Sequence, residues 1–328
     1  GDYLSEKWKF SEDSASFIMY AIAGKTPKDT AVEGIAAVQR YFMSIGGYGK
    51  TPFIYPLYGT GEIPQAFCRL AAVFGGIYIL RQKIDGFTLS KETSKCTGIV
   101  MNGKHIKSKW IVTSSRCTPA SCAEATRTRV SRAVLITDAN IVANNTEPTL
   151  LLCVPPSTTS NPHNVNVLCL SSQAVACPHG KWLVQLTSPA VNTAKSDLEG
   201  VTKLLTRDPE ETDNDKATPT LLFSKYFTST SATHDSLKLA DGTELENLLM
   251  IRSRGSADLH FEDIVTEAEE TFRKICAEEE FLPPAPNPED VVWETAGDDN
   301  EGSADDAEEI RLATLEISSD AILSDVTE

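Results

Sequence analysis

The polar side chains of one short segment, residues 51–81, have the types and the spacing of a binding surface. Glu62, Gln65 and Arg69 stand at positions i, i+3 and i+7, which places them on one face of a helix. Three tyrosines flank this row: Tyr55, Tyr58 and Tyr78. Because Tyr and Arg are enriched at the hot spots of protein interfaces, the pattern indicates a surface that docks another protein. The alternative is a solvated helix face with an internal Glu–Arg pair.

The elements that position these side chains are encoded in the same segment. β-forming residues at 53–55 and 77–80 predict a short strand on each side of a central helix. Pro64 suits the first turn of that helix, where its missing N–H costs little. Apolar residues then recur at helical spacing: Phe67, Leu70, Ala71 and Phe74. Glycines permit the turn before the helix and end it afterwards: Gly59, Gly61, Gly75 and Gly76.

Other chemistry finds little support. Residues 59–64, GTGEIP, superficially resemble a dinucleotide fingerprint, but Pro64 replaces the third glycine and Glu62 puts negative charge where a phosphate would sit. The chain has no GxSxG and no HExxH motif, and its five histidines are scattered. The eight cysteines form no CxxC pair, and most lie in apolar runs as small hydrophobes. We therefore expect no cofactor, no metal site and no catalytic residue.

Residues 55–81, YPLYGTGEIPQAFCRLAAVFGGIYILR, resemble the signature of the superfamily of Rab escort proteins and Rab GDP-dissociation inhibitors. Two further stretches resemble the escort branch: residues 275–290, ICAEEEFLPPAPNPED, and residues 131–138, SRAVLITD. The resemblance runs from about Tyr3 to Asp290. It implies that the chain corresponds to the C-terminal part of the family, without the glycine-rich strand–turn–helix of the N-terminal half.

The escort branch implies a function in binding rather than in catalysis. Its members hold a newly made Rab GTPase in the GDP state, present it to Rab geranylgeranyltransferase and deliver the prenylated product to a membrane. The partners implied are therefore Rab GTPases, the transferase heterodimer, the geranylgeranyl lipid of the bound Rab and, transiently, a membrane. The Rab-binding residues of the family correspond here to seven positions: Tyr55, Tyr58, Glu62, Gln65, Arg69, Tyr78 and Ile79.

Two alternative functions stay open. The first is a Rab GDP-dissociation inhibitor, which recycles Rab that is already prenylated and would not support prenylation. At the position of Ile79 the dissociation inhibitors carry Met, so the site stays apolar in both branches. The second is a flavin-dependent oxidoreductase, because the fold of the superfamily is related to that of flavin oxidases. A yellow absorbance spectrum would identify it.

Composition and charge favour a cytosolic protein. The chain has 328 residues, is 41% hydrophobic and carries a net charge of −16. From Pro283 to Glu328 fourteen Asp and Glu stand against one Arg, so −13 of that charge lies in the tail. A nucleic-acid partner is not expected, because phosphate neutralisation needs clustered Lys and Arg. No apolar run has the length of a membrane span.

The fold class expected is mixed α/β, with several sheets in a flavoprotein-like large domain. We predict three parts: helices of a small lipid-binding domain at 1–48, a partial Rab-binding α/β domain at 49–282 and an acidic disordered tail at 283–328. In the first part, Ala21, Ala23, Ala36 and Ala37 leave room for a lipid slot or serve plain packing. Because part of the parallel sheet is not in this chain, we expect uncovered apolar edges.

Local signals predict the elements of the folded parts. Ser11 and Thr30 each cap a helix, and Asn102–Gly103 indicates a hairpin turn. The clearest later helices are 194–205 and 262–276. Strands are expected at 86–89, 96–101, 105–107, 110–112, 130–138, 150–154, 165–170, 182–186 and 221–227, and polar loops at 212–218 and 228–242.

Overall fold

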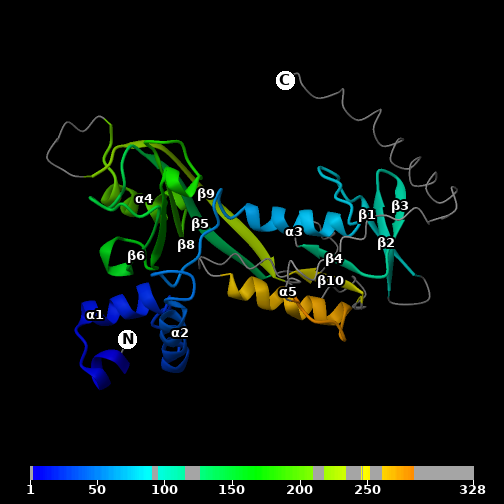
Figure 1. Cartoon of the computed structure of the whole chain (residues 1–328), viewed down its shortest axis with the longest axis horizontal. Coiled ribbons are helices and arrows are strands. Elements are labelled where there is room, and N and C mark those ends of the chain that lie inside the picture. The colour runs from blue at the N-terminus through cyan, green and yellow to red at the C-terminus, as the bar shows by residue number, and fades with distance from the viewer. Residues whose placement is uncertain are drawn as a thin grey trace, which may run out of the picture. The chain divides into compact units, whose positions relative to one another are not determined.

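The computed structural model (Figure 1) describes residues 3–90, 95–114, 126–209, 218–233, 245, 247–251 and 261–283. The chain divides into one compact unit, Gly1–Glu279, and a second, Glu280–Glu328. Beyond Pro283 the predicted acidic tail lies outside the described residues. The described residues of the first unit form a mixed α/β structure with three separate sheets, as expected for the fold class.

The N-terminal helices start where their caps predict. Ser11 accepts the backbone N–H of Ser14 at 3.3 Å, and Thr30 with Glu33 forms a complete capping box. Gly46, in the left-handed region at φ 92°, lies just beyond the end of the last helix. Two segments are wound as π-helical turns rather than as the α-helix we expected. The elements are η1 (Tyr3–Lys7), α1 (Glu12–Ser16), η2 (Phe17–Ile22) and α2 (Ala31–Ser44).

A five-stranded antiparallel sheet carries the main core. Its strand order is β6-β7-β8-β5-β9. The register aligns Cys169, Val184 and Leu135 across the three central strands, and all three side chains are buried. The strands are β5 (Thr126–Thr137), β6 (Thr149–Val154), β7 (Val165–Leu170), β8 (Trp182–Pro189) and β9 (Leu221–Thr233). The helix α4 (Ala194–Leu205) covers the face that these buried residues share, through Leu198 and Val201.

One buried carboxylate fixes the start of α4 on this sheet. Asp197, only 6% exposed, accepts the Ser131 hydroxyl of β5 at 2.6 Å. It also accepts the backbone N–H groups of Val191 at 3.1 Å and Asn192 at 3.0 Å. The amide of Asn161 donates to the Asp197 carbonyl at 2.9 Å, so both ends of this residue are satisfied.

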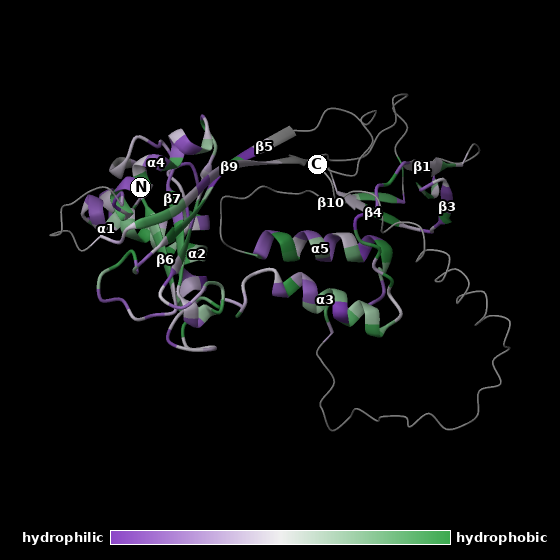
Figure 2. Ribbon diagram, turned by 90° about the horizontal axis from the view of Figure 1, so that it is seen from above, coloured by the Kyte–Doolittle hydropathy of each residue, from purple (hydrophilic) through white to green (hydrophobic). Residues whose placement is uncertain are grey.

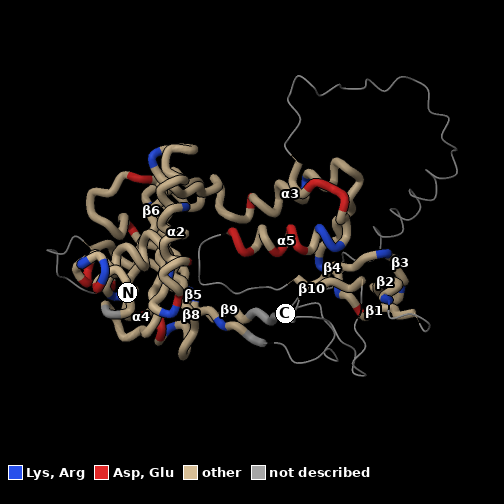
Figure 3. Tube along the Cα trace, turned by 90° about the horizontal axis from the view of Figure 1, so that it is seen from below, with Lys and Arg blue, Asp and Glu red and all other residues tan. Residues whose placement is uncertain are grey.

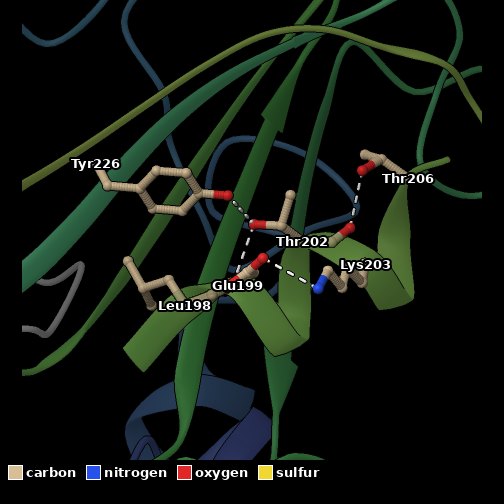
Figure 4. Close-up of polar contacts among 6 residues, drawn as sticks. All are labelled: Leu198, Glu199, Thr202, Lys203, Thr206 and Tyr226. Atoms are coloured by element: carbon tan, nitrogen blue, oxygen red, sulfur yellow. Dashed lines mark hydrogen bonds and ion pairs between the residues drawn. The ribbon is translucent and has the colours of Figure 1, made fainter. Parts of the chain in front are cut away.

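A second contact fixes the far end of the helix. The Tyr226 hydroxyl of β9 lies 3.0 Å from the Thr202 hydroxyl of α4 (Figure 4). The Thr202 hydroxyl in turn donates to the Leu198 carbonyl, and Lys203 pairs with Glu199 on the exposed side. The helix is therefore held by a polar contact at each end and by apolar packing between them.

Two smaller sheets lie elsewhere in the unit. The first is the antiparallel sheet β1-β2-β3, in which Asn102 and Gly103, both with positive φ, form the predicted hairpin turn. The second is the parallel pair β4 and β10. The side chain of Asn247 links the two sheets. Its oxygen accepts the Cys96 N–H at 2.8 Å, and its NH₂ group donates to the carbonyls of Cys96 at 2.7 Å and Lys109 at 2.8 Å. The strands are β1 (Gly86–Leu89), β2 (Cys96–Met101), β3 (Lys104–Lys107), β4 (Ile111–Ser114) and β10 (Leu248–Ile251).

The helices α3 (Glu62–Val73) and α5 (Glu262–Ile275) carry no buried residue. Both are amphipathic, and Figure 2 shows polar and apolar residues side by side along each of them. Acidic residues line much of α5 (Figure 3), and one of them, Glu262, pairs with Arg40 of α2. Short helices gain most of their stability from tertiary packing, so both helices depend on few anchoring contacts.

Three sequence predictions differ from the structure. The segments 53–55 and 77–80 form no strand and pair with no strand in the described part of the chain. High β-propensity favours an extended backbone, but a strand also needs a partner. The polar stretch 228–233, predicted as a loop, continues β9 because β5 offers pairing partners along its whole length. The predicted loop residues 212–217 and 234–242 lie outside the described residues.

Replacing Asp197 by Ala is expected to destabilise the protein by about 2–3 kcal/mol, because the buried Ser131 hydroxyl and two partly buried backbone N–H groups lose their acceptor. Denaturant unfolding followed by circular dichroism measures this change. Asp208→Ala removes an exposed carboxylate just beyond the same helix and serves as the matched control. Equal unfolding midpoints for the two variants would contradict the importance of the buried carboxylate.

Burial raises the pKa of the Cys169 thiol to about 11, against an ordinary value of 9.0. The unfolded chain therefore loses this proton at lower pH than the folded chain does. The contribution to stability is fully present below pH 9, and about 2–3 kcal/mol of it is lost as the pH rises through 11. We expect Cys169→Ala to flatten the fall in unfolding free energy between pH 8.5 and 10.5. A slope identical to that of the parent protein would refute the assignment.

Candidate functional site

A tight turn brings the chain into α3. Tyr58 and Gly59 both have left-handed backbone, at φ 67° and 95°. The turn closes through the Glu62 N–H, which donates to the Gly59 carbonyl at 3.1 Å, and the Ile63 N–H, which donates to the Thr60 carbonyl at 3.3 Å. These contacts satisfy helix N–H groups that have no partner within the helix.

Two glycines end α3, as the sequence predicts. The Gly75 N–H donates to the Ala72 carbonyl at 3.1 Å, and the Gly76 N–H donates to the Ala71 carbonyl at 2.8 Å. With Gly75 at φ 81°, this is a Schellman motif. A Cβ at Gly76 would lie 2.8 Å from the Ala71 carbonyl oxygen, so the backbone there has no room for a side chain. The helix therefore has a defined length and a defined exit.

The predicted polar row lies on the exposed surface of α3. Glu62, Gln65 and Arg69 are all exposed. The Gln65 amide donates to the Glu62 carboxylate at 3.5 Å. Among the residues that the structure describes, Arg69 has no ion pair or hydrogen bond, so the internal Glu–Arg pair of the alternative interpretation does not form. The guanidinium is thus available to an outside partner.

Tyr78 stands beside the middle of the helix. Its hydroxyl forms a hydrogen bond with the Cys68 thiol, and this bond is the main reason that the pKa of Tyr78 is raised above its ordinary value. The ring is 52% exposed, and the neighbouring Ile79 is 46% exposed. Sequence reasoning did not single out Cys68, because a cysteine one residue before Arg69 carries no signal of a tyrosine contact.

Tyr55 differs from the other predicted site residues. Its side chain is half-buried, and burial raises the pKa of its hydroxyl. That hydroxyl accepts a hydrogen bond from the backbone of Thr60. Tyr55 is thus less exposed than Tyr58, which is 67% exposed. We use the name platform for the six exposed residues: Tyr58, Glu62, Gln65, Arg69, Tyr78 and Ile79.

The apolar side of α3 is also exposed in the described structure. Phe67, Leu70 and Phe74 are 52%, 54% and 83% exposed. The adjoining Ile77 and Leu80 are exposed to 85% and 80%. A regular apolar spacing specifies which residues share a face, but it does not supply the element that covers them.

A largely apolar cavity of about 510 Å³ lies among the N-terminal helices. This volume lies within the range of roughly 300–1,000 Å³ that is usual for small-molecule sites. Gly34 and Ala23 are among the small residues at its wall, and the predicted Ala21, Ala36 and Ala37 are not. The apolar and aromatic residues that line it are Tyr3, Leu4, Trp8, Phe10, Ile18, Met19, Ile35 and Val38.

The described part of the chain holds no group of three or more His, Cys, Asp or Glu side chains that could bind a metal ion. In the same residues no helix has both the length and the hydropathy to cross a bilayer. The platform has one carboxylate and one guanidinium, and neither is paired with a nucleophile. A carboxylate and a guanidinium on an exposed surface can form charge-assisted hydrogen bonds with another protein.

Relatives of known name match along most of the chain. The human "Rab proteins geranylgeranyltransferase component A 2" is 36% identical over 327 residues, which cover 98% of this chain and 49% of the relative. The human component A 1 is 32% identical over 96% of this chain and 48% of the relative. A Rab GDP-dissociation inhibitor of Saccharomyces cerevisiae is 30% identical over 60% of this chain and 44% of its own length. The chain thus spans about half the length of the curated relatives it matches.

A crystal structure supports the fold. The Rab GDI of Plasmodium falciparum superposes with a TM-score of 0.67 and 19% identity, over 85% of this chain and 60% of that one. The resemblance drawn from residues 55–81 is confirmed by these relatives and by a family profile. That profile, described as GDP dissociation inhibitor, matches residues 2–279, and the chain therefore belongs to the GDP dissociation inhibitor family.

Proposed function

We propose that the protein binds GDP-bound Rab GTPases through the platform and presents them, as an escort protein, to Rab geranylgeranyltransferase. The observation that carries this proposal is the exposed row of Glu62, Gln65 and Arg69, whose guanidinium pairs with none of the residues that the structure describes. The names of the two human relatives support these partners, since both are called components of a Rab geranylgeranyltransferase.

The platform combines two kinds of interaction. Arg69 offers a planar set of donors to carboxylates or carbonyls of a GTPase, and Glu62 offers an acceptor for its Lys, Arg or backbone N–H groups. Tyr58, Tyr78 and Ile79 supply apolar area beside these groups. Polar groups fix orientation, and the aromatic rings contribute contact area at a low cost in side-chain entropy.

The cavity among the N-terminal helices is the proposed receptor for the geranylgeranyl chain of the bound Rab. Its wall is dominated by apolar and aromatic side chains, and a lipid chain needs burial rather than directional bonds. Delivery to a membrane then requires only that the lipid exchange one apolar environment for another. In this proposal residues 1–48 are the lipid-binding helices, 49–282 the Rab-binding domain and 283–328 a disordered acidic tail.

The protein itself acts as a non-catalytic accessory subunit in the cytosol and visits membranes transiently. It holds no resident cofactor, because the chemistry belongs to the transferase. A second candidate function is that of a Rab GDP-dissociation inhibitor, which the match to the yeast inhibitor favours. The two functions differ in one assay: an escort protein supports geranylgeranyl transfer to a bare Rab, and a dissociation inhibitor does not.

Replacing Arg69 by Ala is expected to weaken binding of GDP-bound Rab by at least about 1 kcal/mol, which is about fivefold in affinity. Stability should not change, since the side chain is exposed. Calorimetric titration of the full chain measures the affinity, and the melting temperature checks the fold.

Arg273→Ala is the matched control, because it removes an exposed Arg of α5 that contacts only Glu269 of its own helix in the described structure. We expect this variant to bind Rab as the parent does. Unchanged affinity in Arg69→Ala, or equal losses in both variants, would rule out the platform.

Gly34→Leu tests the lipid receptor. A Cβ at Gly34 meets no atom within 4 Å, so the new side chain enters the cavity without a backbone clash. Replacing a helical glycine is expected to stabilise the fold by up to about 1 kcal/mol. The affinity for a fluorescent geranylgeranylated peptide should fall about tenfold, since the cavity becomes overfilled when the lipid enters.

Gln39→Leu places the same side chain on α2 at an exposed position outside the cavity and should leave lipid affinity unchanged. Lipid binding by Gly34→Leu with the parent's affinity would assign the lipid to another site. Rab binding in the absence of lipid should be the same in all three proteins, so the assay separates the cavity from the platform.

A further inference from the structure

Two residues with left-handed backbone meet at the base of the platform. Tyr58 has φ 67°, and Val175 has φ 57° and ψ 24°. The Tyr58 N–H donates to the carbonyl of Ala174 at 3.1 Å, so the two turns are joined by one backbone hydrogen bond. A β-branched residue in this region is a genuine outlier, and such conformations persist where the surrounding structure fixes them.

The second turn, Ser172–Val175, follows strand β7 of the five-stranded sheet. The short 3₁₀ helix η4 (Ser172–Ala174) follows β7 directly. The Ser171 hydroxyl accepts the Gln173 N–H at 3.2 Å, and the Val175 N–H donates to the Ser172 carbonyl at 3.0 Å. Ala174 is only 2% exposed. The direction of its carbonyl is therefore set by the turn and not by solvent.

The thiol of Cys177, just beyond the same turn, contacts two backbone carbonyls. Cys177 lies within hydrogen-bond distance of the carbonyls of Leu170, at 3.5 Å, and Lys181, at 3.2 Å. Leu170 is the fully buried last residue of β7. The chain that leaves the turn is thus connected back to the buried end of β7.

The platform has little else to hold it. In the ranges that the structure describes, no other backbone hydrogen bond leads from residues 54–81 to the rest of the molecule. The helix α3 buries none of its side chains. Just beyond this segment, the Asp85 N–H donates to the Val100 carbonyl of β2 at 2.9 Å. The bond between Tyr58 and Ala174 therefore anchors the start of α3, and it contributes to the orientation in which α3 presents Glu62 and Arg69 to a partner.

We propose that the turn Ser172–Val175 is a positioning element for GTPase binding: the left-handed backbone of Val175 aims the Ala174 carbonyl at the Tyr58 N–H and so fixes the platform. This inference rests on the proposed function of the platform. In this arrangement the backbone conformation of residue 175 matters for binding, and its side chain does not.

Substitutions at residue 175 separate backbone from side chain. Val175→Gly and Val175→Asn both accept positive φ, so each should bind GDP-bound Rab within about twofold of the parent. Val175→Pro fixes φ near −65° and removes the N–H that bonds Ser172, so its affinity should fall about tenfold. Amide exchange followed by NMR should show that the Tyr58 N–H loses protection in the proline variant while β7 and β8 keep theirs.

Three results would overturn the proposal. In the parent protein the Tyr58 amide could exchange as fast as an unprotected amide, a measurement that needs no variant to fold. The proline variant could bind Rab like the parent while Tyr58 loses protection. The glycine variant could bind as weakly as the proline variant, which would make Val175 a side-chain contact. Arg69→Ala is measured in parallel, because unchanged binding in that variant refutes the platform itself rather than its positioning.

Discussion

The structure depends on the burial of one face of the five-stranded sheet beneath α4. The register places Leu135, Val184 and Cys169 in one row, and α4 adds Leu198 and Val201 above it. Such packing is non-directional, so it does not by itself fix where along the sheet the helix begins. The carboxylate of Asp197 supplies that information, because its acceptors must meet the donors of Ser131, Val191 and Asn192. Apolar burial provides the stability, and one satisfied carboxylate provides the register.

The candidate site is connected to this core by a turn at the end of β7. The turn follows Leu170, the fully buried last residue of β7, and its Ala174 carbonyl accepts the Tyr58 N–H. The helix α3 contributes its own local order through the turn at Gly59 and the Schellman motif at Gly75. A surface helix whose ends are fixed in this way can expose its polar row without first paying an ordering cost at binding. Preorganisation of this kind raises affinity without adding contacts.

The two proposed binding regions use different physics. The platform exposes hydrogen-bonding groups of Glu62, Gln65 and Arg69. These groups contribute to binding only when the donors and acceptors of the partner align with them. The cavity of the N-terminal helices has a mainly apolar wall. Such a wall binds an apolar chain in almost any orientation, because the burial of apolar surface is non-directional. A prenylated GTPase carries both a folded polar surface and a flexible apolar chain. One protein that offers both kinds of site can therefore recognise the GTPase by the first and shield its lipid with the second.

The sequence by itself determined the features that depend on near neighbours in the chain. Helix caps at Ser11 and Thr30, the hairpin turn at Asn102 and the glycine stop at Gly75 all rest on contacts within a few residues. The spacing of Glu62, Gln65 and Arg69 likewise predicted their common helix face, which the structure exposes.

Only the tertiary structure decided the features that depend on partners far along the chain. The β-forming residues 53–55 and 77–80 pair with no described strand, whereas the polar residues 228–233 form a strand because β5 lies beside them. Tyr55 is half-buried, and Val175, which carries no sequence signal, ends the turn whose Ala174 carbonyl accepts the Tyr58 N–H. The reason is physical: propensity and spacing act over one or two turns of chain, but strand pairing and burial join residues more than a hundred positions apart.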